Sequence, residues 1–186
     1  IQLGLVVFGL AVATPFVLDA VGGLPEAWRA YLSARPDRGG LLPPWQAHGT
    51  FWTRESLVGW WDVSLMLVFG GIPWNCYFQR VLSCQSPVKA QWHSVLAGLA
   101  TMACTVPPLL IGIAATAHEW PSGVAADLAA HPSQTLPMVL HHLVPPWVAV
   151  LGLGAIVGAV TSSFSASILS PGAMCTWNRF SRLRHP

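Results

Sequence analysis

The feature that most constrains this chain is a long stretch, residues 128–178, that contains no Asp, Glu, Lys or Arg. About 20 apolar residues of helix cross a bilayer core of about 30 Å, so this stretch is too long for a single span. Pro145 and Pro146 divide it, because proline interrupts helical hydrogen bonding. We therefore predict a short helix at residues 136–143, lying before the membrane, and a spanning helix at residues 147–176.

Three further segments have the length and apolar character of membrane spans: residues 1–18, 59–83 and 91–117. Of the 186 residues, 53% are hydrophobic and only 9% are charged, whereas about 25% of residues are charged in a soluble domain. The formal net charge of +2 is scattered and does not form a nucleic-acid-binding surface. The sequence predicts an all-α protein embedded in a lipid bilayer, with about four transmembrane helices and no nucleic-acid partner.

Basic residues predict the orientation of these spans, because cytoplasmic loops carry an excess of Lys and Arg. Arg80 and Lys89 lie around the loop at residues 84–90, and three arginines lie in the tail at residues 177–186. Residues 118–146 contain neither Lys nor Arg. We expect the short loop and the tail to be cytoplasmic and the loops at residues 19–58 and 118–146 to be extracellular, as in a multi-pass plasma membrane protein.

The two ends of the sequence lie close to apolar segments. Ile1 opens an apolar run that has no basic region before it and no small-residue cleavage site after it, so this run is not typical of a signal peptide. Pro186 follows soon after the last predicted span. We expect an internal piece of a longer membrane protein, whose remaining helices are partners of these spans.

The span at residues 59–83 contains a break near its centre. Residues 70–74 read GGIPW, and two glycines followed by a proline weaken a helix and free backbone groups from hydrogen bonding. Such a break in a membrane is tolerated only inside protein or beside a water-filled cavity, and it is typical of a transporter binding site. Trp74 could offer a cation–π surface to an organic cation. The alternatives are a simple proline kink and a tryptophan that fills space in the core.

The last span carries small polar residues on one face. Ala159, Ser162 and Ser163 are spaced i, i+3 and i+4, so they share a side of the helix. Two hydroxyls and a carbonyl supply hard, uncharged oxygen ligands, which suit a small cation such as sodium. The alternative is close helix packing, because small and hydroxyl-bearing residues commonly join membrane helices.

Two motifs carry a resemblance to a known family. Residues 70–83 read GGIPWNCYFQRVLS, residues 161–163 read TSS, and residues 167–170 read SILS. These runs resemble the sodium/solute symporter family, and within it the members that take up choline. The resemblance covers essentially the whole chain.

The resemblance implies part of the inverted-repeat fold shared with the leucine transporter, with the four spans as core helices five to eight. It implies that Ala159, Ser162 and Ser163 bind sodium, that Trp74 lines the substrate pocket, and that Tyr77 is a further pocket residue. Sodium-coupled uptake of choline follows as the expected activity, with chloride as a further candidate ion. The first core helix, which would complete both sites, lies outside these residues.

The resemblance has one clear departure. Choline-transporting members carry Ala-Asp after the paired serines, whereas this chain has Phe164 and Ser165. A carboxylate is missing and a large ring is added, and an intramembrane carboxylate commonly has a function. Two alternatives therefore stand beside choline uptake: a symporter of the same family for another solute, and a transport-inactive membrane relative.

The sequence gives little support to an enzyme. The apolar segments contain no nucleophile elbow, phosphate loop or paired carboxylates. His141 and His142 are adjacent, so on a helix they point about 100° apart, and no partner stands at metal-ligand spacing.

Overall fold

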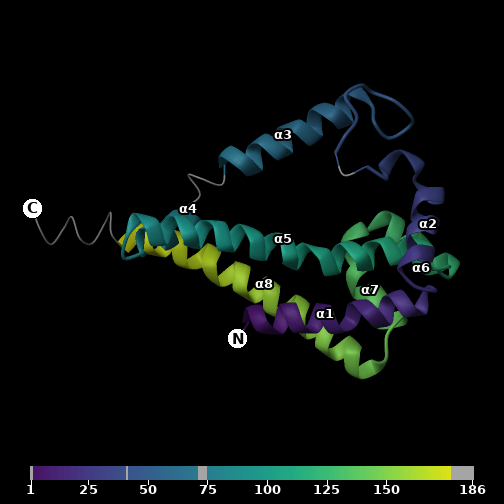
Figure 1. Ribbon diagram of the computed structural model, residues 1–186. Coiled ribbons are helices and arrows are strands. Elements are labelled where there is room, and N and C mark those ends of the chain that lie inside the picture. The colour runs from purple at the N-terminus through teal and green to yellow at the C-terminus, as the bar shows by residue number, and fades with distance from the viewer. Residues whose placement is uncertain (1, 41, 71–74, 177–186) are drawn as a thin grey trace, which may run out of the picture.

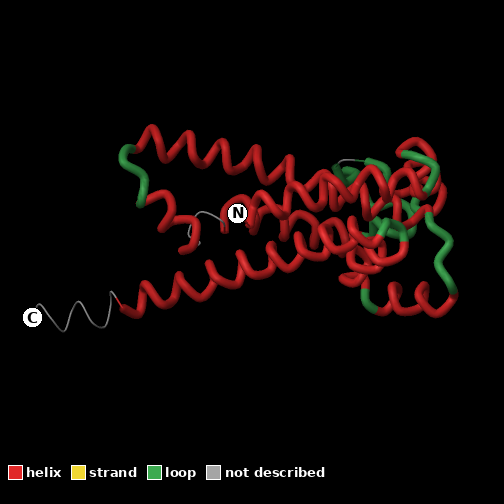
Figure 2. The backbone as a smooth tube through the Cα atoms, turned by 90° about the horizontal axis from the view of Figure 1, so that it is seen from below, coloured by secondary structure: helices red, strands yellow, loops and turns green. Residues whose placement is uncertain are grey.

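The computed structural model describes residues 2–40, 42–70 and 75–176, and these ranges are built from helices and connecting loops (Figure 1). The α-helices are α1 (Gln2–Ala20), α2 (Leu24–Ala34), α3 (Arg54–Gly70), α4 (Asn75–Leu82), α5 (Pro87–Ala117), α6 (Ser122–Ala130), α7 (Thr135–His142) and α8 (Pro146–Cys175). Two short 3-10 helices are η1 (Pro36–Arg38) and η2 (Pro132–Gln134). Figure 2 shows the loops gathered at the ends of the long helices.

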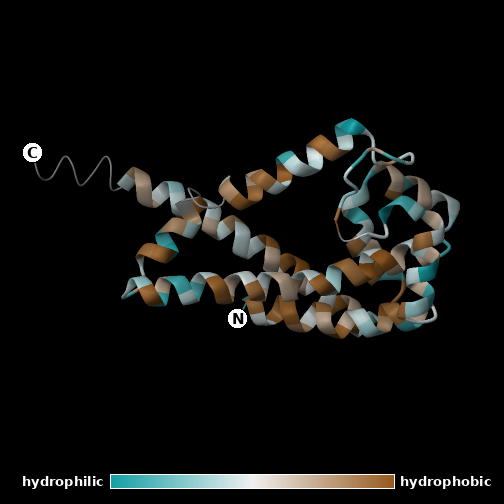
Figure 3. Cartoon of the chain, turned by 45° about the horizontal axis from the view of Figure 1, so that its top comes forward, coloured by the Kyte–Doolittle hydropathy of each residue, from teal (hydrophilic) through white to brown (hydrophobic). Residues whose placement is uncertain are grey.

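Three of the described helices, α1, α5 and α8, are long and apolar enough to cross a membrane. Their residue ranges overlap closely with the predicted spans at residues 1–18, 91–117 and 147–176. Hydrophobic residues run along these helices (Figure 3). Together with the sequence composition, these helices indicate an integral membrane protein.

The predicted span at residues 59–83 corresponds to two shorter helices, α3 and α4. They end and begin on either side of residues 71–74, which lie outside the described residues. Helix α3 buries none of its own residues, and it runs apart from the α1, α5 and α8 bundle in Figure 1. A single broken span through this region stays a prediction, as does the sidedness of the loops.

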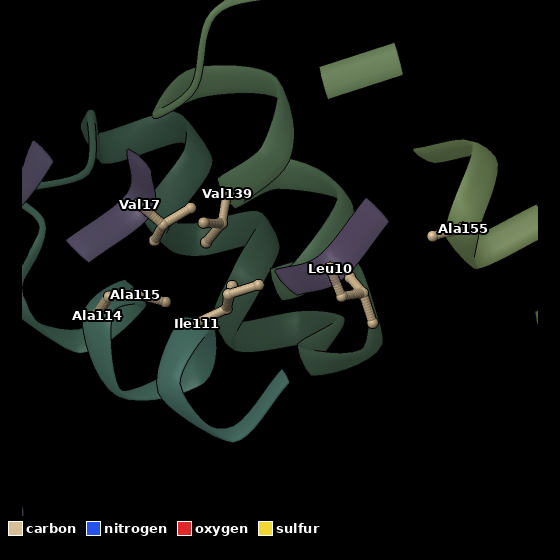
Figure 4. Packing of buried hydrophobic residues seen from close by; sticks show 7 residues of the cluster. All are labelled: Leu10, Val17, Ile111, Ala114, Ala115, Val139 and Ala155. Atoms are coloured by element: carbon tan, nitrogen blue, oxygen red, sulfur yellow. The ribbon is translucent and has the colours of Figure 1, made fainter. Parts of the chain in front are cut away.

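The hydrophobic core lies between α1, α5, α7 and α8. Figure 4 shows the buried residues that meet there, which are Leu10, Val17, Ile111, Ala114, Ala115, Val139 and Ala155. Most of these side chains are small or branched, which lets helix backbones approach closely. The core therefore packs together the long helices at the end of the bundle where the short helices lie.

Helices α1 and α8 approach each other closely at Gly9. A Cβ built on Gly9 would lie 2.7 Å from the carbonyl oxygen of Leu151 and 2.9 Å from the Cβ of Ala155. No larger residue fits there without a shift of backbone, so Gly9 determines how near the two helices come. Thr14, one turn after Leu10 on α1, donates its hydroxyl to the carbonyl of Leu10 at 2.7 Å and so satisfies a buried polar group.

The loops predicted at residues 19–58 and 118–146 contain helices α2 and α6, which were not predicted from the sequence. Helix α2 packs against α5, and α6 lies in the second loop with η2 and α7. Helix α7 occupies residues for which a short helix before the membrane was predicted, and α8 begins at Pro146 as the paired prolines indicated. Proline is favoured in the first turn of a helix, where its missing amide costs nothing.

Candidate functional site

A cavity of about 600 Å³ lies between α4, α5 and α8, with one residue of α3 at its edge. Its volume is in the range of small-molecule binding sites. The lining residues are mostly small or polar, and they are Val68, Cys76, Tyr77, Arg80, His93, Ala97, Thr101, Ser162, Ser163, Ala166 and Ser167. The cavity is the candidate functional site because it contains residues from both motifs of the sequence.

Ser162 and Ser163 of α8 both line this cavity. Ser162 is half-buried and Ser163 is exposed. In the part of the chain that the structure describes, neither hydroxyl has a hydrogen-bond partner. Their oxygens are therefore available to a ligand. Such hydroxyl oxygens are hard, uncharged ligands that suit a small cation.

Neighbouring hydroxyls on α8 behave differently. Thr161 donates to the carbonyl of Val157 at 2.8 Å, and Ser165 donates to the carbonyl of Thr161 at 2.8 Å. Neither residue lines the cavity. The paired serines thus differ from their neighbours both in direction and in hydrogen bonding.

Ala159, the third predicted sodium ligand, lies one turn before Ser163 on α8. It is half-buried and is not among the residues that line the cavity. A carbonyl at this position could complete a cation site only together with oxygens from another helix. The structure therefore groups the two serines and leaves Ala159 beside the cavity.

Tyr77 lines the cavity from α4 and is joined to α5. Its hydroxyl donates to Ser94 Oγ at 2.7 Å, and Ser94 donates in turn to the carbonyl of Ala90 at 2.9 Å. Chains of hydroxyls of this kind strengthen each member by polarisation. Tyr77 as a whole is 36% exposed, and it lines the cavity, so part of the residue is accessible to a ligand.

Cys76, the residue before Tyr77, joins α4 to α8. Its thiol donates to the carbonyl of Ala166 at 3.5 Å. Consecutive residues on a helix point about 100° apart, so Cys76 and Tyr77 reach the two helices on either side. Helix α4 therefore forms a wall of the cavity held at both edges.

Trp74, the predicted substrate residue, lies outside the described residues, as do Gly71, Ile72 and Pro73. Helix α4 begins at Asn75, directly after it. The assignment of Trp74 to a substrate pocket stays a prediction.

The α5 wall of the cavity was not predicted from the sequence. His93, Ala97 and Thr101 line it, and they recur every fourth residue along α5. This spacing places them on one face of the helix. The signal was present in the sequence, but an apolar span contains many small residues at such spacing.

The cavity lining carries the positive charge of Arg80. Arg80 and His93 line it, and none of the described lining residues is acidic. The described residues also contain no group of three His, Cys, Asp or Glu side chains that could hold a metal ion. A monovalent cation here would depend on hydroxyl and carbonyl oxygens.

Comparison with known proteins identifies the family. A family model described as "Sodium:solute symporter family" matches residues 1–185. Among similar proteins is "High-affinity choline transporter 1" of Torpedo marmorata, which is 36% identical over 182 residues, or 96% of this chain and 30% of that protein. The human "High affinity choline transporter 1" is 35% identical over 184 residues, covering 96% of this chain and 30% of the human protein.

A shorter match has higher identity. "High-affinity choline transporter 1" of Drosophila melanogaster is 43% identical over 124 residues, which is 63% of this chain and 20% of that protein. The chain thus spans at most about 30% of the length of these relatives. The family match nevertheless extends over almost every residue. On this evidence the chain belongs to the sodium:solute symporter family.

Proposed function

We propose that the protein containing this chain takes up choline, or a similar organic cation, across the plasma membrane by coupling its movement to sodium. The family description supports sodium-coupled transport of a solute rather than an enzymatic reaction. The names of the similar proteins support choline as the solute. The family description names sodium and no anion, so chloride is not part of the proposal.

The observation that carries this proposal is the shared cavity. Ser162 and Ser163, expected to bind sodium, and Tyr77, expected near the substrate, come from distant parts of the sequence and line one space of about 600 Å³. A coupled transporter needs its ion and its solute to bind in the same region, so that each alters the affinity for the other.

The proposal includes the fold and its orientation. We infer that α1, α5 and α8 are core helices five, seven and eight of an inverted-repeat transporter, with α3 and α4 as the broken sixth. With residues 84–90 on the cytoplasmic side, the cavity lies between the centre of the membrane and the cytoplasm. It would then be the inner passage through which sodium and solute leave the site.

A positively charged passage favours release of a cation over tight binding of a cation. Arg80 and His93 lie in the same cavity as the serines. A guanidinium group repels a sodium ion or a quaternary ammonium. Tight binding would therefore require the helices that this chain does not contain, with Trp74 and the serines forming one wall of the complete site.

Uptake of labelled choline by the full-length protein, measured over a range of sodium concentrations, tests the proposal. Replacing one ligand hydroxyl, as in Ser162→Ala or Ser163→Ala, is expected to raise the half-saturating sodium concentration about three- to tenfold. Ser165→Ala is the matched control, because Ser165 lies on the same helix, does not line the cavity and has a backbone partner.

Each other outcome has a distinct meaning. Choline uptake that does not depend on sodium would contradict the coupling. Sodium-dependent uptake of another solute in a panel, with no uptake of choline, would contradict the substrate and leave the serine site standing. If the full-length protein binds neither sodium nor any solute saturably, it is a transport-inactive relative.

A further inference from the structure

A second cavity, of about 550 Å³, lies away from the serines, between the corner formed by α2 and η1 and the last third of α5. One wall is polar and aromatic and the other is apolar. The polar wall contains Trp28, Tyr31, Arg35 and Arg38, and the apolar wall includes Leu109 and Ile113. A ligand that fits both walls has a polar end and an apolar end.

The aromatic part of this wall is built by helical spacing. Trp28 and Tyr31 are three residues apart on α2, so their side chains are neighbours. Their rings stack with centroids 5.7 Å apart and an interplanar angle of 19°. The Trp28 side chain remains 39% exposed, which leaves part of the indole open to a ligand. An open aromatic face attracts a quaternary ammonium group.

The two arginines make the cavity strongly positive. None of the described residues that line it is acidic. The guanidinium carbon of Arg38 lies 3.5 Å from the centroid of the Phe51 ring, a contact that fixes its position. Asp37, the adjacent acid, does not line the cavity, and its carboxylate accepts a hydrogen bond from the amide of Thr50 at 3.0 Å. Two arginines lining one cavity without a carboxylate favour a phosphate.

The cavity lies where a membrane surface is expected. Helix α5 is one of the candidate spans and ends at Ala117, a short distance beyond Ile113. Helices α2 and α6 gather at this end of the bundle (Figure 1). Leu109 is exposed on the side of the cavity that leads into the span. Trp and Tyr side chains concentrate at the headgroup level of a bilayer.

From these contacts we propose that this cavity binds a membrane phospholipid with a phosphocholine headgroup. The phosphate lies at Arg35 and Arg38, the quaternary ammonium lies on Trp28 and Tyr31, and an acyl chain follows Leu109 along α5. Free choline fits less well, because two guanidinium groups repel it. A headgroup without a quaternary ammonium leaves the open indole face unused. The site is separate from the serine cavity and does not depend on the transported solute.

Lipid binding to the full-length protein, purified in detergent and followed by native mass spectrometry, tests the proposal. The probes are dioctanoyl phosphatidylcholine, dioctanoyl phosphatidylglycerol and soluble phosphocholine. Loss of both guanidinium groups in Arg35→Gln/Arg38→Gln is expected to weaken binding of both lipids about tenfold or more. Trp28→Leu is expected to weaken phosphatidylcholine more than phosphatidylglycerol. Arg29→Gln is the matched control, because Arg29 is an exposed arginine of α2 that does not line the cavity.

Unchanged phosphatidylcholine binding in the double arginine variant would overturn the site. Equal or tighter binding of phosphatidylglycerol by the natural protein would overturn the role of Trp28 and Tyr31. Binding of soluble phosphocholine as tightly as the lipid would assign the cavity to a soluble ligand and overturn the membrane source. If the double variant does not fold, the single variants Arg35→Gln and Arg38→Gln replace it, and unchanged binding in both would overturn the proposal.

Discussion

Tyr77 and Ser94 join α4 to α5 through a hydrogen bond of 2.7 Å between their hydroxyls. They lie 17 positions apart, on two helices separated by the short connection at residues 83–86. The bond is a link between a short helix beside the expected break and a long membrane span. Its position at the edge of the serine cavity makes it a determinant of where α4 sits.

Removing either hydroxyl is expected to loosen α4. Tyr77→Phe and Ser94→Ala each remove one member of the pair and are expected to lower the free energy of unfolding of the full-length protein by about 1 kcal/mol. The double variant is expected to lose little more than either single variant, because both remove the same bond. Thermal unfolding in detergent measures all three. Fully additive losses would show that the two hydroxyls act independently.

Cys76 offers a chemical test of the cavity. Its thiol is half-buried, lines the cavity and lies 3.5 Å from the carbonyl of Ala166. A small membrane-permeant thiol reagent is expected to label Cys76 in the full-length protein, and saturating sodium with choline is expected to slow that labelling. Mass spectrometry of the modified peptide measures the rate at Cys76. Cys84, half-buried but outside the cavity, is the internal control whose labelling rate is expected not to change.

Phe164, where choline-transporting relatives were expected to carry alanine, is not expected to obstruct transport. Its side chain is 66% exposed and does not line the serine cavity. Phe164→Ala is therefore expected to change neither the sodium dependence nor the maximal rate of choline uptake by more than about twofold, a free-energy difference well under 1 kcal/mol. A large gain of uptake in this variant would mean that the ring blocks the complete protein.

A side chain at position 9 is expected to destabilise the packing of α1 against α8. In Gly9→Ala the new Cβ would meet the carbonyl oxygen of Leu151 and the Cβ of Ala155 at 2.7 and 2.9 Å. Forced separation of α1 and α8 is expected to cost about 1–3 kcal/mol of stability, measured by thermal unfolding of the full-length protein.

Gly4→Ala is the control for this change. Gly4 lies on the same helix, and nothing approaches its Cβ position within 4 Å. Alanine is a better helix former than glycine by about 1 kcal/mol. The control is therefore expected to be neutral or slightly stabilising, and equal destabilisation of both variants would remove the packing explanation.

Several features of this protein could be read directly from the sequence. The spanning helices depend on local length and hydrophobicity, because lipid requires every backbone group to be paired within its own helix. The start of α8 follows from Pro145 and Pro146, which act on the backbone around them. The family follows from a continuous motif at residues 70–83 and from the serine run of α8.

Helices α2 and α6, within the predicted outer loops, could not be read in the same way. Helix α2 is short and amphipathic, and it is held by packing against α5. Short helices are marginal on their own, so their presence depends on a surface supplied by another part of the chain. The arginine and aromatic cavity exists only because of that packing.

The sequence by itself determined that this is an all-helical membrane protein of a sodium-coupled family, because those properties depend on local hydrophobicity and on a continuous motif. Only the tertiary structure decided that Ser162, Ser163 and Tyr77 face one cavity while Ala159 lies beside it. It also decided that His93 and Thr101 form the opposite wall. The reason is that the rotation and separation of neighbouring helices are set by many small contacts, such as that of Gly9 with Leu151, between residues far apart in the sequence.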